Sequence, residues 1–124
     1  SSGVRSSVEA ARNALSDKIQ YLTEFLGGEY EIQGAYPAWE YRKESPLRDK
    51  MVEVYETMYG QKPEVVAIHA GLECGLFYKK IDGLDCVSLG PDMKDIHTSE
   101  EVLDIASTER VWKYLVKVLE ELKD

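Results

Sequence analysis

The fold is decided by the stretch VVAIHAGLECG, residues 65–75, in which an apolar run leads into a loop that contains glycine. A short apolar run of this kind, bounded by Pro63 and Gly71, predicts a β-strand buried on both faces of a sheet. Ligands of α/β proteins commonly bind at the loop that follows such a strand. The stretch therefore predicts an α/β fold with a candidate site at this loop.

The elements around this stretch also indicate an α/β unit. Residues 45–60 predict a helix that begins with a serine–proline capping signal and ends at a glycine. A short helix is predicted through residues 74–80, and residues 84–89 are a second candidate for a buried strand. The last helix is expected to start near Ser107. Because helices and apolar strands alternate, both faces of the sheet are expected to be covered.

The N-terminal part is predicted to contain one amphipathic helix and one strand. Apolar residues recur every three or four positions over residues 7–26, and Ser6 precedes Glu9 with the spacing of a capping box. Residues 29–34 alternate polar and apolar, as a strand with one solvated face does. A unit this small cannot offset its chain entropy. It is expected to pack on the following unit or, preferably, to be a remnant of a larger sheet.

Composition and charge disfavour several classes of function. The chain has 15 Lys and Arg residues against 23 Asp and Glu residues, a net charge of −8. A field of this sign repels nucleic acid and anionic lipid, and it is compatible with a site for divalent cations. No apolar run approaches the roughly 20 residues of a membrane span. The two cysteines, Cys74 and Cys86, are expected to be reduced thiols in a cytosolic protein.

A second loop with potential chemistry, residues 90–101, follows the second strand candidate. It contains His97 among several carboxylates, a setting that favours a metal ion. No other histidine or cysteine lies at ligand spacing from His97, so no closed metal motif is matched. Simpler alternatives stay open, in which His69 and His97 are ordinary hydrogen-bonding residues and the acidic side chains form a solvated loop.

Both loops resemble sequences of one peptidase family. The segments AIHAGLECGLF (67–77), LDCVSLGP (84–91) and HTSEE (97–101) are similar to stretches of Xaa-His dipeptidases. These enzymes are also called aminoacyl-histidine or cytosol non-specific dipeptidases and belong to the M20 family of metallopeptidases. The resemblance extends back to YPAW (36–39) and covers nearly the whole chain.

The resemblance implies a domain organisation. Residues 1–39 would be the C-terminal part of a lid or dimerisation domain, a helix–strand remnant. Residues 40–124 would be the C-terminal part of a di-zinc peptidase-like α/β catalytic domain. The chain is thus expected to be a C-terminal fragment of a longer protein.

The resemblance also implies roles for individual residues. His97 would be a ligand of one of two zinc ions, with cobalt or manganese as alternatives. The residues placed at the substrate are Gly71, Leu72, Glu73, Arg5 and His69. Among them, Arg5 would clamp the substrate carboxylate, a task that suits a bidentate guanidinium. No catalytic residue is implied, because the general base and the other ligands of the family lie N-terminal to these positions.

Two classes of function are therefore expected. In the first, the parent is a cytoplasmic, homodimeric dipeptidase that hydrolyses Xaa-His or a broad range of dipeptides with water activated by two metal ions. The chain alone would be inactive. In the alternative, the chain is a non-catalytic α/β interaction module that dimerises through an exposed sheet edge.

Overall fold

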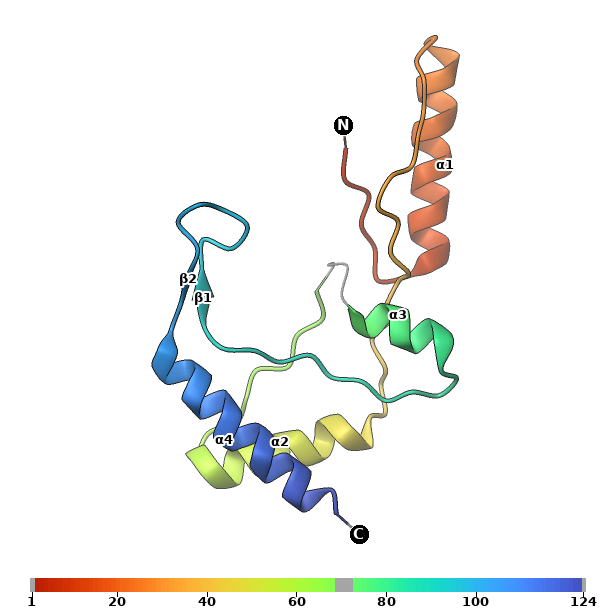
Figure 1. Ribbon diagram of the computed structural model, residues 1–124. Coiled ribbons are helices and arrows are strands. Elements are labelled where there is room, and N and C mark those ends of the chain that lie inside the picture. The colour runs from red at the N-terminus through yellow and green to blue at the C-terminus, as the bar shows by residue number, and fades with distance from the viewer. Residues whose placement is uncertain (1, 69–72, 124) are drawn as a thin grey trace. The chain divides into compact units, whose positions relative to one another are not determined.

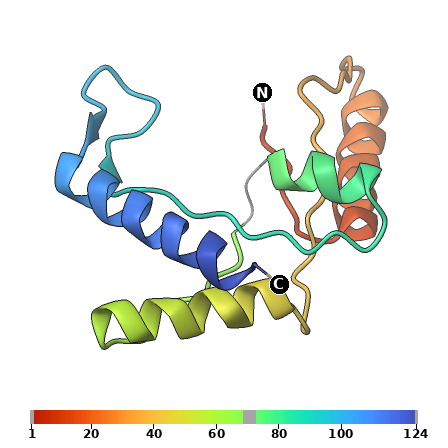
Figure 2. The same ribbon diagram turned by 60° about the horizontal axis from the view of Figure 1, so that its bottom comes forward.

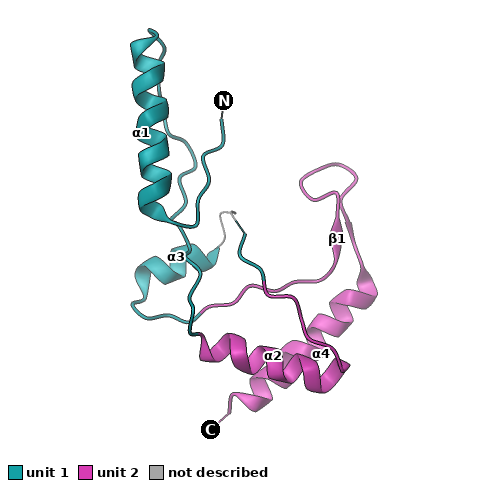
Figure 3. Cartoon of the chain, turned by 180° about the vertical axis from the view of Figure 1, so that it is seen from behind, with its two compact units in different colours: residues 1–44, 66–85 teal, residues 45–65, 86–124 magenta. Residues whose placement is uncertain are grey.

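A computed structural model describes residues 2–68 and 73–123 (Figure 1; turned in Figure 2). The elements, in chain order, are α1 (Glu9–Phe25), α2 (Pro46–Tyr59), α3 (Glu73–Lys80), β1 (Met93–Lys94), β2 (Val102–Leu103) and α4 (Ile105–Glu121). The chain divides into two compact units that alternate along the sequence. One contains residues 1–44 and 66–85, and the other residues 45–65 and 86–124 (Figure 3). These elements are consistent with part of an α/β domain.

In the first unit, α1 confirms the predicted N-terminal helix but not its predicted cap. Val8 is the N-cap and makes no side-chain cap bond, whereas the Ser6 hydroxyl accepts a hydrogen bond from the Val8 N–H at 3.1 Å. The capping-box prediction is therefore wrong. The helix ends as predicted at its glycines. There the Gly28 N–H donates to the carbonyl of Thr23 at 2.9 Å, and Gly27 takes a left-handed φ of 79°.

The strand predicted over residues 29–34 is absent from the structure. Side chains attach the segment that follows α1 to that helix instead. The hydroxyls of Tyr30 and Ser16 share a hydrogen bond, and the Arg12 guanidinium donates to the carbonyl of Tyr36. A strand is stabilised by pairing with another strand, and the described residues of this unit provide no partner.

The two buried strands predicted over residues 65–68 and 84–89 are also absent from the structure, so this prediction is wrong. The described residues of both segments form no sheet ladder, and Val66 is 63% exposed. Their apolar composition did predict burial, but a buried strand needs neighbouring strands on its edges and covering layers on its faces. The described residues provide neither. The 1–39 and 40–124 domain boundary stays a prediction.

The second unit is organised around the packing of α4 on α2 (Figure 2). Four buried side chains form its core, namely Met51, Val54, Tyr114 and Val118. The α2 helix follows its predicted signals, because the Ser45 hydroxyl accepts from the Arg48 N–H at 3.1 Å and Gly60 ends the helix at a φ of 67°. Val87, from the second predicted strand, packs against this core without pairing.

A small hairpin precedes α4 and was not predicted. Strands β1 and β2 pair antiparallel, with Met93 opposite Leu103 and Lys94 opposite Val102. The helix begins two residues before the predicted Ser107, because Asp104 is its N-cap and accepts from the Ser107 N–H at 2.5 Å. Among the residues that the structure describes, no helix is long and apolar enough to cross a membrane.

Candidate functional site

The predicted metal ligand, His97, lies in the loop of the β1–β2 hairpin and is exposed. Its backbone is left-handed, with a φ of 67°, and Asp95 has a φ of 53°. These are the two non-glycine residues with positive φ among those described. This conformation is sterically unfavourable for residues with a Cβ atom, although Asn, Asp and His adopt it more often than most. The loop therefore holds its histidine in a conformation that needs support.

Several hydrogen bonds within the loop hold it closed, and one of them reaches His97 itself. The carbonyl of Asp95 accepts from both the N–H and the hydroxyl of Thr98, at 3.2 and 2.6 Å. The Thr98 hydroxyl in turn accepts from the Glu100 N–H at 3.1 Å. The His97 N–H donates to Oε2 of Glu101 at 2.9 Å. The loop is thus closed by its own side chains.

The hairpin is fixed to the first turn of α4. The Asp104 N–H donates to the carbonyl of Asp92 at 2.9 Å, and the Asp92 N–H donates to the hydroxyl of Ser107 at 2.8 Å. Ser107 is buried, and its hydroxyl also donates to the carbonyl of Asp104 at 2.8 Å. An ion pair between Arg110 and Asp92, 3.4 Å apart, adds a contact from the second turn. Both ends of the hairpin are therefore attached to the helix.

The described residues fit one metal ligand rather than a complete metal site. Across residues 2–68 and 73–123, no three His, Cys, Asp or Glu side chains are placed to hold a metal ion together. An exposed imidazole on a braced loop has the donor chemistry for a single bond to zinc, cobalt or manganese.

The predicted substrate-binding residues lie in the first unit. Arg5 is exposed in the segment before α1. Glu73 is the exposed first residue of α3, where the positive end of the helix dipole stabilises its carboxylate. Gly71, Leu72 and His69 lie outside the described residues. The roles of all five remain predictions.

Gly75, the last glycine of the quoted stretch, has a packing role. It is buried in α3, and a Cβ atom there would lie 3.0 Å from the carbonyl oxygen of Pro37 and 3.6 Å from Cβ of Trp39. A side chain would crowd this contact, so the glycine lets α3 approach the 37–39 segment closely. Cys74 beside it and Cys86 are both half-buried, and neither is in a disulfide.

A groove of about 320 Å³ lies over α2 and α4 in the second unit. It is lined by Met58, Trp112, Lys113, Val116, Lys117 and Glu120. Hydrogen bonds from Lys113 to Glu109 and from Lys117 to Glu121 raise the pKa of both lysines and lower the pKa of both carboxyls. None of the predicted site residues lines this groove, so it is a feature separate from the His97 loop.

The sequence reasoning missed the part played by Glu101. The composition of the loop predicts only a solvated acidic side chain at this position, whereas the structure shows that the Glu101 carboxylate accepts a hydrogen bond from the His97 N–H. Local bonds from side chains to backbone N–H groups are typical of Ser, Thr, Asn and Asp, so the sequence gives little reason to expect one from a glutamate. The spacing alone did not distinguish Glu101 from its neighbour Glu100.

No protein-family model matches the chain. The chain is 33% identical over 119 residues to the cytosol non-specific dipeptidase of Escherichia coli (strain K12), a match that covers 96% of this chain and 24% of that protein. It is also similar to the crystal structure of aminoacylhistidine dipeptidase from Vibrio alginolyticus, with a TM-score of 0.75 and 34% identity. That match again covers 96% of this chain and 24% of the other. The chain thus spans about a quarter of the length of these relatives.

Proposed function

We propose that this chain forms part of a metal-dependent dipeptidase of the M20 type. The proposal is based on its homology to about a quarter of the length of the cytosol non-specific dipeptidase and of the aminoacylhistidine dipeptidase. The observation that carries the proposal is identity of 33–34% over 96% of the chain. The match includes both loops that the sequence singled out. The substrate class is dipeptides, of Xaa-His or broader type, and the working assembly is a cytosolic homodimer.

In this proposal the chain contributes one metal ligand and part of the substrate-binding surface. His97, on its braced hairpin loop, binds one of two divalent ions, with zinc as the first choice. Arg5 holds the substrate carboxylate and Glu73 lines the cleft with Gly71, Leu72 and His69. A divalent ion in such an enzyme acts as a Lewis acid. Taken alone, the 124 residues are expected to be inactive, because a single imidazole cannot hold two ions.

A chimera tests this proposal. This chain replaces the matching quarter of the Escherichia coli dipeptidase, and hydrolysis of dipeptides is measured with zinc and after chelation. We expect zinc-dependent hydrolysis by the chimera and none by the 124-residue chain. A folded chimera without dipeptidase activity, with the unmodified Escherichia coli enzyme active beside it, would contradict the proposal.

Substitution of His97 in the chimera tests the ligand itself. His97→Ala is expected to weaken zinc affinity by more than the roughly 10- to 100-fold that loss of an outer-shell partner costs. Ser99→Ala, at an exposed position of the same loop, is the matched control and is expected to behave as the parent chimera. If His97→Ala kept both metal content and activity, the ligand assignment would be wrong.

An interaction module is the second candidate, and exposed apolar residues on α4 favour it. Ile105, Trp112 and Leu119 are 83%, 66% and 57% exposed. They lie seven residues apart, which places them on one stripe of the helix. An apolar stripe of this kind fits a second copy of the chain. Light scattering of the 124-residue chain tests this candidate: a dimer that forms without zinc and that Trp112→Gln converts to a monomer would support it, and a monomeric chain would contradict it.

A further inference from the structure

The backbone of His97 requires an explanation that the proposed function does not supply. The proposed role of His97 as a metal ligand requires its imidazole but not a left-handed backbone, and His97 has a φ of 67°. Such conformations persist where the surrounding structure holds them, and they occur frequently at functional sites. The question is therefore which group holds His97 in place.

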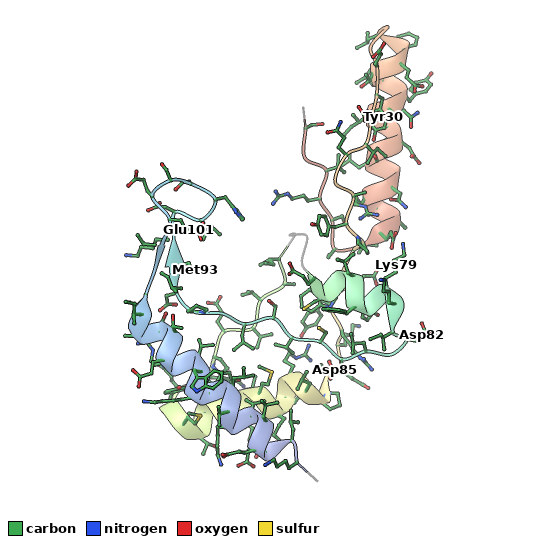
Figure 4. The ribbon with its side chains drawn as sticks, viewed as in Figure 1. Tyr30, Lys79, Asp82, Asp85, Met93 and Glu101 are labelled. Carbon is green, nitrogen blue, oxygen red and sulfur yellow. The ribbon has the colours of Figure 1, made fainter. Side chains whose placement is uncertain are left out.

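The loop assigns that task to a single side chain. The bonds made by Thr98 and Asp95 connect these two residues with each other and with the backbone N–H groups of Glu100 and Glu101. None of them involves the His97 N–H. That N–H donates to the carboxylate of Glu101 at 2.9 Å. Glu101 immediately precedes Val102, the first residue of β2, so it lies where the loop rejoins the paired strands (Figure 4).

We propose that Glu101 is a positioning residue for His97, whose carboxylate holds the left-handed backbone through the His97 N–H and so fixes the place of the imidazole. The inference rests on the proposed function, because it matters for zinc only if His97 is a ligand. Glu101 acts through the backbone of His97 and is not itself assigned to the metal. Its pairing with a backbone N–H separates it from an acidic residue that only adds negative charge.

The variants separate hydrogen bonding from charge. Glu101→Ala removes the acceptor and the charge, whereas Glu101→Gln removes the charge and keeps an acceptor oxygen at the same distance from the backbone. Glu100→Ala is the matched control, because it removes the same charge from the adjacent exposed position of the loop.

The first readout is independent of metal and of activity. Exchange of the His97 amide hydrogen is measured by NMR in the 124-residue chain. Glu101→Ala is expected to accelerate this exchange by up to about tenfold, the equivalent of one lost hydrogen bond. Glu101→Gln and Glu100→Ala are expected to stay near the parent rate. The Met93–Leu103 pair is followed in the same spectra, so that loss of the whole hairpin is recognised.

The second readout is zinc affinity of the chimera, measured by competition with a chelator. Glu101→Ala is expected to weaken zinc affinity about 10- to 100-fold, with Glu101→Gln restoring most of it. If Glu101→Ala weakened zinc binding no more than Glu100→Ala, or if Glu101→Gln were as damaging as Glu101→Ala, the positioning role would be overturned.

Failure of the underlying assignment gives a different result. If His97→Ala left zinc affinity unchanged, His97 would not be a ligand and the proposed function would lose its metal-binding residue. The positioning role would then fail with it. If instead His97→Ala abolished zinc binding while Glu101→Ala changed neither readout, the ligand would stand and only the role of Glu101 would be refuted.

Discussion

The phenolic hydroxyl of Tyr114 donates a hydrogen bond to the carbonyl oxygen of Met51 at 2.7 Å, between helices α4 and α2. Both side chains are buried in the four-residue core of their unit. The ring of Tyr55 meets that of Tyr114 edge-on, with 5.5 Å between their centroids. One tyrosine thus contributes apolar packing, a ring contact and a buried polar bond to the same helix pair.

Removal of this hydroxyl is expected to destabilise the helix pair. Tyr114→Phe keeps the ring and loses the bond to the Met51 carbonyl, at a cost of about 0.5–1.5 kcal/mol in the free energy of unfolding. Urea unfolding followed by circular dichroism measures the change. Tyr21→Phe, at a 73% exposed position on α1, is the control and should unfold like the parent. Equal midpoints for Tyr114→Phe and the parent would refute the expectation.

The same tyrosine predicts a loss of stability at high pH. Burial, followed by the neighbouring Tyr55 and Tyr59, raises the pKa of Tyr114 above its ordinary value of 10.0. The folded chain therefore keeps the proton at a pH where the unfolded chain has lost it. This contribution is complete below pH 10 and is lost as the pH rises through the folded pKa.

The measurement compares the parent with Tyr114→Phe in urea titrations from pH 8 to pH 11. The difference in stability between the two is expected to shrink above pH 10. The raised pKa values of Lys113 and Lys117 act in the same direction in both proteins, so the comparison isolates the tyrosine. A difference that stayed constant across this range would contradict the prediction.

Gly75 is expected to resist substitution by alanine. Alanine is favoured over glycine inside a helix by about 1 kcal/mol, but overpacking costs about 1–3 kcal/mol. Because the new Cβ would lie 3.0 Å from the Pro37 carbonyl oxygen, Gly75→Ala should give no gain and up to about 2 kcal/mol of loss. Gly90→Ala, where a Cβ meets nothing within 4 Å, is the control. If Gly75→Ala instead stabilised the chain by about 1 kcal/mol, the whole helical advantage of alanine, the contact with Pro37 would not restrict this position.

Substitution of Arg5 tests the proposed contact with the substrate carboxylate. In the chimera, Arg5→Ala is expected to raise KM about 10- to 100-fold with a smaller change in kcat, since a charged hydrogen bond is lost from substrate binding. Arg5→Lys should recover only part, because an ammonium group cannot make the bidentate contact. Lys18→Ala removes the same charge from an exposed position on α1 and serves as the control. Unchanged KM in Arg5→Ala would remove Arg5 from the site.

The helices were predictable because their signals are local. Each signal acts on backbone only a few residues away. Examples are the cap at Ser45, the glycine at position 60 and the apolar periodicity over residues 7–26. The start of α4 was misplaced because Asp104 and Ser107 are both good capping residues. Ser107 is instead a buried residue of the first turn of α4, three positions after the N-cap Asp104, and its hydroxyl accepts from the Asp92 N–H.

The strands were not predictable in the same way, because pairing is not local. The 65–68 and 84–89 runs have the composition of buried strands, and their partners are not among the described residues. The hairpin of two-residue strands is too short to leave an alternating pattern. For the site, sequence alone selected the His97 loop, while the bond from His97 to Glu101 emerged only from the folded backbone.

Because the hairpin is attached to Ser107 and Asp104, cation binding at the His97 loop, as proposed above, would be thermodynamically linked to folding of the helix pair. A cation that immobilised the His97 loop would also hold Asp92 against the first turn of α4, and would raise the melting temperature of the α2–α4 pair in proportion to the logarithm of its concentration. Conversely, a substitution that destabilised the packing of α4 on α2 would weaken cation binding at the His97 loop. The hydroxyl of Ser107 binds both Asp92 of the hairpin and Asp104 at the start of α4, so this contact would couple cation binding to the folding of the helix pair.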